Sequence, residues 1–176
     1  MMRRLLLLRH AKSAYPQGVG DIDRPLNARG REAAPLMGAY IARESLTPDH
    51  VMVSPARRTQ ETWEAVRAEW PETPMETVPS IYEAPAGRIL DAIRSAPAEA
   101  RSLLVIGHNP GLGDLALRLA GEGPKELRND LRDKFPTAAL AVLEFEAQGW
   151  EPIAAGAGRL VRFVRPRQLA AEMDDD

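Results

Sequence analysis

Near the start of the chain, residues 5–10 read LLLLRH, and this short stretch decides the fold. Four leucines in succession, without polar alternation, are typical of a strand that is buried on both faces of a parallel sheet. Polar chemistry begins where this strand ends, at Arg9 and His10. The same pattern returns at residues 102–108, SLLVIGH, where the clearest apolar strand of the sequence leads into His108.

Helical and strand patterns alternate around these two strands. Asn27 is predicted to cap a helix over residues 28–44, in which apolar residues recur at helical spacing. After a strand at 51–53, Ser54 is predicted to cap the next helix, with Pro55 at its first position. The other expected elements are a weak strand at 75–78, a helix near 86–95, a helix that ends near 121, a loop or short exposed helix within 121–136, and strands at 138–145 and 158–164.

Strands that alternate with helices predict a single α/β domain with a largely parallel sheet. The two strands of the last third are expected to be antiparallel, at the edge of that sheet. The chain has 176 residues, a length that suits one domain. We therefore assign residues 1–168 to the domain and 169–176 to an acidic C-terminal tail, which we expect to be disordered from residue 172 onward.

Composition excludes several classes of function. The formal net charge is −2, from 23 Lys and Arg against 25 Asp and Glu, so recognition of phosphate must come from a local cluster of charges. The chain has no cysteine, which excludes disulfides, thiolate nucleophiles and cysteine-based zinc sites. Its N-terminal apolar run is too short for a signal peptide, and no stretch approaches the roughly 18 apolar residues of a membrane span. We expect a cytoplasmic protein with neither nucleic-acid nor membrane partners.

Two of the three histidines occupy equivalent places in the chain. His10 and His108 each follow a buried strand at the point where a loop begins. In open parallel sheets, ligands bind beyond the carboxyl ends of the strands, where the strand order reverses. If the two strands are neighbours there, both imidazoles face one crevice. The third histidine, His50, is expected to lie at the surface.

Arginines follow two of the predicted strands, 5–8 and 51–53. Arg9 adjoins His10, and Arg57 and Arg58 fall in the first turn of the helix that follows Ser54. Cations at a helix N-terminus oppose the helix dipole, an arrangement that is better explained if an anion binds between them. The guanidinium fork matches the oxygens of a phosphate group in both geometry and charge.

A metal site is not expected. Asp21 and Asp23 are two candidate ligands, but no third ligand has a suitable spacing from them. Arg9, next to His10, would repel a cation from the predicted crevice.

Three short motifs resemble those of the histidine phosphatase superfamily, also called the phosphoglycerate mutase-like family. They are RHAKS at residues 9–13, SPARRTQET at 54–62, and IGHNP at 106–110. The second motif has Ser followed by Arg at +4 and Thr at +8, a spacing that selects Arg58. The short chain, the RHAKS version of the first motif, and DRPLN at 23–27 look most like the SixA branch of phosphohistidine phosphatases. The resemblance covers nearly the whole chain and implies a three-layer α/β/α fold of the phosphoglycerate mutase-like type.

The resemblance also implies a catalytic site that works without a metal or other cofactor. His10 would attack phosphorus and become a phosphohistidine, which water then hydrolyses. Arg9, Arg58 and His108 would neutralise charge on the transferring phosphoryl group. The remaining candidates are Ser13 and Arg24, as phosphate-binding residues, and Glu83, as the proton donor to the leaving group.

Three functions stay open on the sequence alone. The first is a phosphatase that acts on phosphohistidine in a protein, such as a histidine phosphotransfer domain. The second is a phosphatase of small phosphate monoesters on the same fold, for which the acid Glu83 matters more because an alkoxide leaves poorly. The third is a non-catalytic module that binds phosphoproteins. An equally supported interpretation of Glu83 is that it is a surface carboxylate without a catalytic role.

Overall fold

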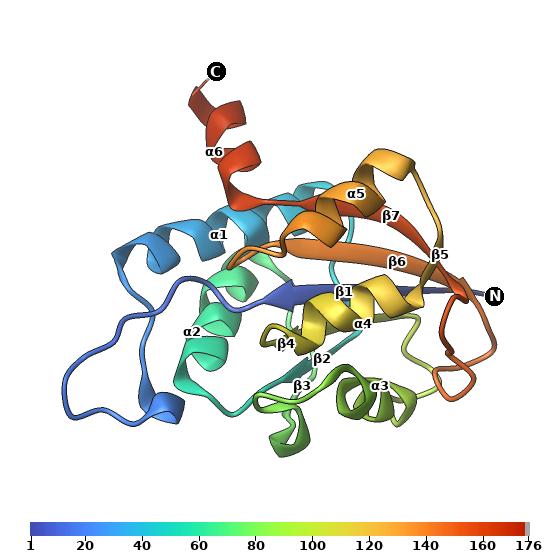
Figure 1. Ribbon diagram of the computed structural model, residues 1–176, viewed down its shortest axis with the longest axis horizontal. Helices are drawn as coiled ribbons and strands as arrows, with labels where there is room; N and C mark the ends of the chain where they lie inside the picture. The colour runs from blue at the N-terminus through green and yellow to red at the C-terminus, as the bar shows by residue number, and fades with distance from the viewer. Residues whose placement is uncertain (175–176) are drawn as a thin grey trace.

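The computed structural model describes residues 1–174 and shows a seven-stranded sheet with helices on both of its faces (Figure 1). The strands are β1 (Met2–Arg9), β2 (His50–Val53), β3 (Met75–Thr77), β4 (Ser102–Gly107), β5 (Ala120–Glu122), β6 (Leu140–Glu146) and β7 (Gly158–Val164). The helices are α1 (Ala28–Arg43), α2 (Arg57–Val66), α3 (Ala86–Arg94), α4 (Gly111–Leu119), α5 (Lys125–Asp133) and α6 (Pro166–Asp174). Short 3-10 turns are η1 (Asp21–Asp23), η2 (Arg67–Glu69) and η3 (Pro79–Ile81).

The sheet has the strand order β3-β2-β4-β1-β6-β7-β5, with β1 in the middle. On one side β1 pairs in parallel with β4, and β2 and β3 continue this parallel half. On the other side β1 pairs antiparallel with β6, and β6 pairs antiparallel with β7, as the sequence predicts. The three-residue β5 forms the edge beyond β7. The predicted α/β class with a mostly parallel sheet is therefore confirmed.

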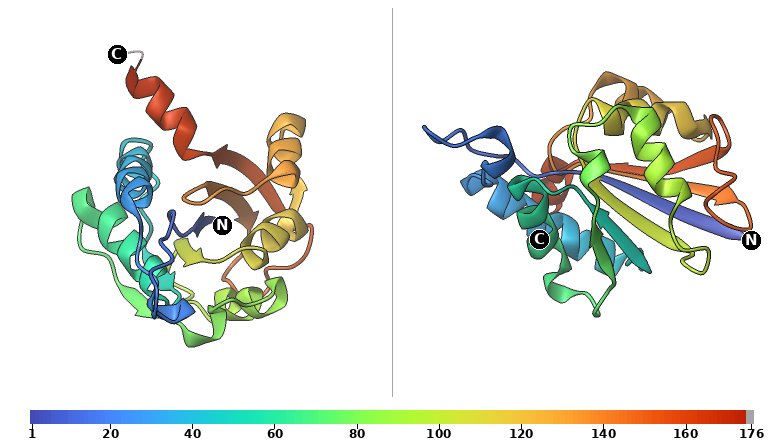
Figure 2. Two further views of the ribbon diagram at one scale, coloured as in Figure 1. Left: turned by 60° about the vertical axis from the view of Figure 1, so that its left-hand side comes forward. Right: turned by 90° about the horizontal axis from the view of Figure 1, so that it is seen from below.

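The four leucines of β1 point alternately into two hydrophobic cores, one on each face of the sheet. Leu5 and Leu7 belong to the core that α3, α4 and α5 cover, whereas Leu6 and Leu8 belong to the core that α1, α2 and α6 cover. Figure 2 shows α1 and α2 on one side of the sheet and α3, α4 and α5 on the other. Side chains alternate between the faces of a strand, so an uninterrupted apolar run is what a central strand with two covered faces requires.

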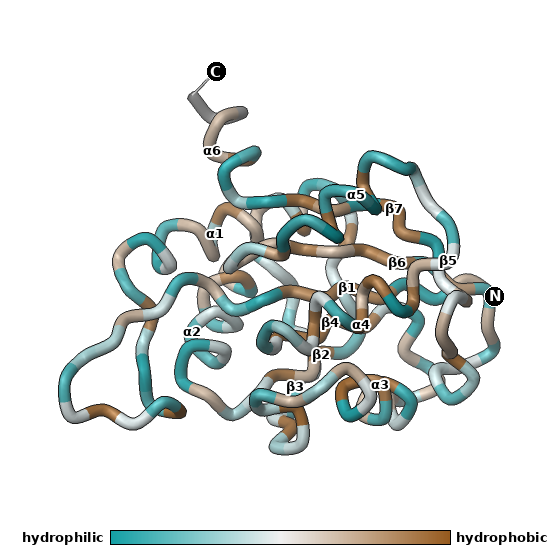
Figure 3. Tube along the Cα trace, viewed as in Figure 1, coloured by the Kyte–Doolittle hydropathy of each residue, from teal (hydrophilic) through white to brown (hydrophobic). Residues whose placement is uncertain are grey.

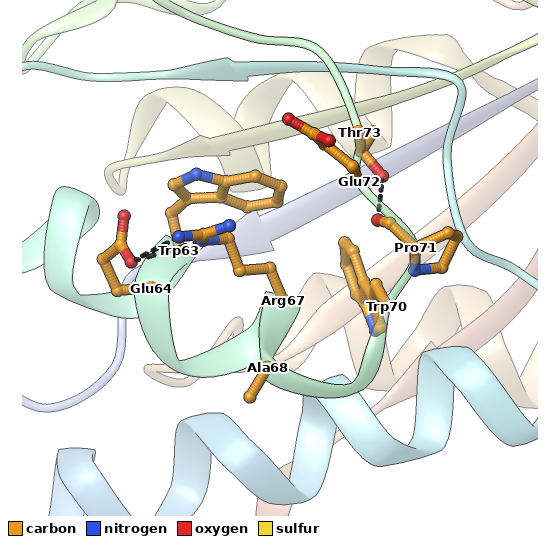
Figure 4. A pocket seen from close by; sticks show the side chains of 8 residues that line it. All are labelled: Trp63, Glu64, Arg67, Ala68, Trp70, Pro71, Glu72 and Thr73. Carbon is orange, nitrogen blue, oxygen red and sulfur yellow. Dashed lines mark hydrogen bonds and ion pairs between the residues drawn. The ribbon is translucent and has the colours of Figure 1, made fainter.

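Close packing between α1 and α2 depends on Gly38. A Cβ at this position would lie 2.3 Å from the backbone oxygen of Val66, so no larger residue fits without moving a helix. Trp63 and Trp70 pack edge to face with their ring centroids 5.8 Å apart, which anchors the turn after α2. They line a surface pocket on the outer side of α2, where Arg67 reaches over Trp63 (Figure 4).

The two predicted helix caps have different outcomes. The side chain of Asn27 caps α1 by accepting a hydrogen bond from the backbone N–H of Gly30 at 2.9 Å, as predicted. Ser54 does not cap α2, which begins at Arg57 with Ala56 as its N-cap. The backbone N–H of Ser54 still donates to Ile106 at the end of the sheet, so the chain turns into the helix two residues later than predicted.

The C-terminal segment also differs from expectation. Disorder was expected from residue 172, but α6 extends through the acidic segment to Asp174, and Leu169 fixes the helix by packing into the core beside α1. Residues 175–176 of the expected tail lie outside the described residues. Within 121–136, the chain forms the end of β5 and the helix α5. Among residues 1–174, no helix is both long and apolar enough to cross a membrane.

Candidate active site

The carboxyl ends of β1 and β4 lie side by side, and each leads directly into a histidine. Arg9, at the end of β1, is opposite Gly107, at the end of β4. The ring centroids of His10 and His108 are consequently only 5.4 Å apart. A cleft of about 370 Å³ opens beside His10. It is lined by Arg9, His10, Lys12, Ser13, Tyr15, Arg24, Arg58, Glu83, Asn109, Lys134, Pro136 and Thr137.

His10 is held as a neutral imidazole with one ring nitrogen available for reaction. Its Nδ1 lies 2.8 Å from the backbone oxygen of Ala11. Because a carbonyl oxygen only accepts hydrogen bonds, Nδ1 carries the proton and Nε2 keeps a lone pair. Burial, reinforced by the positive charges of Arg9 and Arg58, lowers the pKa of His10 from 6.5 to about 4. The ring is therefore unprotonated at Nε2 at neutral pH.

His108 is packed behind this ring and is almost completely buried. Its Nε2 lies 2.7 Å from the hydroxyl of Ser54, and its Nδ1 lies 3.3 Å from Nη2 of Arg58. Burial, reinforced by the charge that His10 and Arg58 can carry, lowers the pKa of His108 to about 3. The neutral ring therefore accepts a hydrogen bond from Arg58 at Nδ1 and donates one to Ser54 from Nε2. The sequence analysis assigned Ser54 to a helix cap and missed this contact.

Arg58 is the buried cation of the site, with only 1% of its surface exposed. It donates to the backbone oxygen of Asp21 at 2.8 Å, to Oδ2 of Asp21 at 3.2 Å and to Oε1 of Glu83 at 2.5 Å. Its Nε has no hydrogen-bond partner within the part of the chain that the structure describes. Arg57, one residue earlier, is exposed and pairs with Glu61. The spacing of the second motif, which selects Arg58, agrees with this placement.

Thr62 connects the second motif, residues 54–62, to the first motif, residues 9–13. Its hydroxyl accepts a hydrogen bond from the backbone N–H of Ala11 at 2.9 Å and donates to the backbone oxygen of Arg58 at 2.7 Å. This single buried hydroxyl joins the residue after His10 to the first turn of α2. Thr62 thus ties the backbone next to His10 to the backbone of Arg58.

The other predicted residues also lie at the cleft. Arg9 donates through Nη1 to the backbone oxygen of Phe135, and its Nε, like that of Arg58, has no partner among residues 1–174. Ser13 accepts a hydrogen bond from Arg24 at 2.9 Å, and the guanidinium of Arg24 lies 4.1 Å from the ring centroid of Tyr15.

Glu83 lies at the mouth of the cleft in a left-handed backbone conformation, with a φ of 48°. Besides its contact with Arg58, its Oε1 is 3.3 Å from Nδ1 of His108. The carboxylate is thus close to the predicted reaction centre but is already engaged by the arginine. Its 44% side-chain exposure leaves it accessible from solvent.

Asp21 is a site residue that the sequence analysis considered only as a metal ligand. Its carboxylate accepts hydrogen bonds from Tyr82, from Arg24 and from Arg58. The hydrogen bond from Tyr82, with the nearby arginines, lowers the pKa of Asp21 to about 2. Tyr82 is 61 residues away in the chain, so no local signal could have found this contact. Over the described residues, no group of three or more His, Cys, Asp and Glu side chains is arranged to hold a metal.

The cleft is strongly cationic although the whole chain is not. Its lining includes three arginines and two lysines, Arg9, Arg24, Arg58, Lys12 and Lys134, and a single carboxylate, Glu83. Of these, Lys12 and Lys134 were not singled out from the sequence. A cluster of guanidinium and ammonium groups around a neutral imidazole can hold an anion and transfer a phosphoryl group to nitrogen.

The pKa of His10 has a consequence for activity. Its lowered value means that the neutral ring is present from alkaline pH down to about pH 5 and is lost as pH falls through 4. We expect kcat/KM, once corrected for titration of the substrate, to keep its plateau down to about pH 5, to be halved near pH 4, and to fall about tenfold for each pH unit below that. Ring titration by nuclear magnetic resonance tests the same point, with circular dichroism to verify folding. A midpoint near 6.5 would contradict the assigned environment of His10.

Comparison with known proteins places this site in a family. The model of the histidine phosphatase superfamily (branch 1) matches residues 5–89, which include the first two motifs. A solved structure from Agrobacterium tumefaciens, assigned as the phosphohistidine phosphatase SixA, is 30% identical, with a TM-score of 0.80 over 93% of this chain and 98% of that one. A second structure with this assignment, from Nakamurella multipartitia, is 26% identical, with a TM-score of 0.84 over 94% and 97%.

A third structure is that of the protein histidine phosphatase SixA complexed with tungstate. It is 25% identical, with a TM-score of 0.75 over 94% of this chain and 99% of that one. All three similarities extend over nearly the full length of both chains, beyond the residues that the family model matches. The chain therefore belongs to the histidine phosphatase superfamily, in its SixA-like branch, and is a phosphatase of the hydrolase class.

Proposed function

We propose that this phosphatase removes phosphate from phosphohistidine in a protein, through a covalent intermediate on Nε2 of His10 and without a metal. The observation that carries this proposal is the state of His10. Its Nδ1–H donates a hydrogen bond to the backbone oxygen of Ala11 at 2.8 Å, and its low pKa of about 4 leaves Nε2 as a free nucleophile among the cations of the cleft.

In the first step, Nε2 of His10 forms a bond to phosphorus while the bond from phosphorus to the substrate nitrogen breaks. His10 keeps its Nδ1 proton, so the phosphorylated ring carries a positive charge. The oxygen of Ala11 accepts from this N–H and stabilises the charge as it develops. The guanidinium groups of Arg9 and Arg58, which line the cleft, supply donors for the phosphoryl oxygens.

In the second step, water forms a new bond to phosphorus and the bond to Nε2 breaks. The water proton goes to the departing phosphate, and His10 returns as a neutral imidazole. Because its Nδ1 already holds a proton, the ring leaves without needing an acid. Ser13 and Arg24, which share a hydrogen bond at the cleft, would hold the phosphate oxygens during both steps. The cationic lining supports the metal-independent part of the proposal because it repels a divalent cation.

The same leaving-group chemistry favours phosphohistidine as the substrate. An imidazole that carries a proton on its second nitrogen leaves as a neutral molecule, whereas an alcohol leaves as a poor alkoxide unless an acid protonates it. Among the described residues, the carboxylate that lines the cleft is Glu83, and its hydrogen bond with Arg58 leaves it engaged rather than free for a leaving group. Similarity to a protein histidine phosphatase supports a phosphorylated protein, such as a histidine phosphotransfer domain, as the partner.

A second candidate function is hydrolysis of a small phosphate monoester, and one observation favours it. Glu83 lies at the mouth of the cleft, 3.3 Å from His108, where it could protonate an alkoxide if it were released from Arg58. The two candidates therefore differ in whether turnover depends on this carboxyl group.

Replacing Glu83 with glutamine tests the choice between them. Glutamine keeps the size of the side chain and tolerates the same backbone conformation. We expect the turnover of phosphohistidine to change less than about twofold, and the hydrolysis of an alkyl phosphate to fall by about 10²-fold or more. The exposed Glu99→Gln serves as the matched control. A large loss on phosphohistidine would contradict the proposed substrate.

A further inference from the structure

A second groove adjoins the catalytic cleft, between α1 and α6. It has a volume of about 420 Å³, and its lining carries four cationic side chains, Lys12, Arg29, Arg165 and Arg167, against one carboxylate, Glu32. Leu36 of α1 lies among the apolar side chains that line it. We refer to this surface as the basic groove. Figure 1 shows α6 leaving β7 close to α1, and residues of both helices line the groove.

The basic groove is continuous with the cleft. Three residues, Lys12, Pro136 and Thr137, line both. A ligand whose phosphoryl group sits beside His10 can therefore extend directly into the groove. A free phosphate or a small ester fills only the cleft, so the groove has no use for such a substrate.

Among the described residues, the four cations of the groove face a single lining carboxylate, Glu32. Arg165 has one distant carboxylate partner, Asp130, at 3.9 Å. Lys12, Arg29 and Arg167 have no ion-pair partner among the residues that the structure describes, and all three are exposed. Since the whole chain has a net charge of −2, this surface is a local concentration of positive charge. Such a surface complements an acidic one.

The loop between β1 and α1, which reaches the cleft at Tyr15, presents exposed apolar side chains. Tyr15, Val19 and Ile22 lie on the loop between β1 and α1, and Tyr15 is 82% exposed. A loop with three exposed large apolar residues within eight positions is typical of a protein contact surface. The basic groove and this loop together thus offer cationic and apolar contacts to a ligand larger than a metabolite.

The geometry points to the basic groove as the docking site for an acidic surface of the phosphorylated protein, next to its phosphohistidine. This inference rests on the proposed function, because it adds a contact surface to the same site. Carboxylates of the partner would pair with Arg29 and Arg167, and its apolar side chains would contact Leu36. The groove would raise the rate of encounter and lower KM without taking part in bond breaking.

The test is a double charge reversal, R29E/R167E, assayed on two substrates. The first is a histidine phosphotransfer domain with an acidic surface, phosphorylated on histidine, and the second is free phosphohistidine. We expect kcat/KM for the phosphorylated domain to fall about tenfold or more, mainly through KM, and to lose its sensitivity to ionic strength. Activity on free phosphohistidine should change less than about twofold.

The control is R101E/K125E, which changes the net charge by the same amount. Arg101 and Lys125 are exposed. They lie toward the amino ends of β4 and β7, at the end of the sheet away from the cleft. This variant should retain the wild-type KM for the phosphorylated domain. Equal losses in the two variants would show a nonspecific charge effect and overturn the docking site.

Other outcomes overturn the inference in different ways. If wild type turns over both substrates and R29E/R167E does the same, the groove does not dock the partner although the proposed function stands. If wild type acts on neither substrate, the proposed function itself fails. If R29E/R167E dissociates a wild-type dimer in sedimentation, the occupant of the groove is a second copy of this chain.

Discussion

Replacing His10 with alanine is expected to abolish turnover, with a loss in kcat/KM of about 10⁴-fold or more on any phosphorylated substrate. The reason is that His108, the neighbouring histidine, cannot replace His10 as the nucleophile. His108 is behind His10, with Nε2 bonded to Ser54 and Nδ1 facing Arg58. Initial rates on free phosphohistidine and on an aryl phosphate give the measurement.

His50→Ala is the matched control for this variant. His50 lies at the start of β2, away from the site, and pairs with Glu76 at 3.2 Å; its side chain is 13% exposed, less than expected for the surface residue that the sequence predicts. Its replacement should leave kcat/KM within about twofold of wild type. Because alanine leaves a small cavity at His10, circular dichroism and thermal unfolding must show that the variant folds. A folded His10→Ala protein with substantial activity would refute His10 as the nucleophile.

The second large effect is expected from Arg58→Lys, which should lower kcat by about 10²- to 10³-fold. Lysine keeps the positive charge but replaces a planar fork with a single ammonium group. In the structure the guanidinium donates hydrogen bonds to Asp21, Glu83 and His108, and the same group lines the cleft. One ammonium group cannot hold these partners and still contact a phosphoryl oxygen.

Arg57→Lys provides the comparison within the same helical turn. Arg57 is exposed and pairs only with Glu61, four residues along the helix, a contact that stabilises the protein little. We expect this variant to retain wild-type activity and thermal stability. Similar losses in the Arg57 and Arg58 variants would contradict the assignment of the buried guanidinium to the phosphoryl group.

Local patterns predicted much of this architecture because each depends on neighbouring residues. The apolar run 5–8 indicates a central strand whichever helices cover it, and Asn27 caps α1 through a bond only three residues long. The antiparallel strands near the C-terminus were found for the same reason. The proximity of His10 and His108 followed from one further rule, that the ends of neighbouring parallel strands meet.

What the sequence could not supply depends on contacts between distant segments. Ser54 looks like a helix cap locally, but β4 brings His108, 54 residues away, within 2.7 Å of its hydroxyl. Asp21 looks like half of a metal site until Arg58 and Tyr82 reach it from other elements. The extension of α6 likewise depends on Leu169 finding the core beside α1. None of these partners can be identified from spacing.

The most direct test of the covalent mechanism is to trap the phosphorylated enzyme. Wild-type protein is mixed with a phosphodonor, quenched rapidly, and its label is located by mass spectrometry and tested for stability in acid and alkali. The mechanism predicts label on His10 that is lost in acid and kept in alkali, and no such label in His10→Ala. Label that survives acid, lies on another residue, or persists in His10→Ala would contradict it.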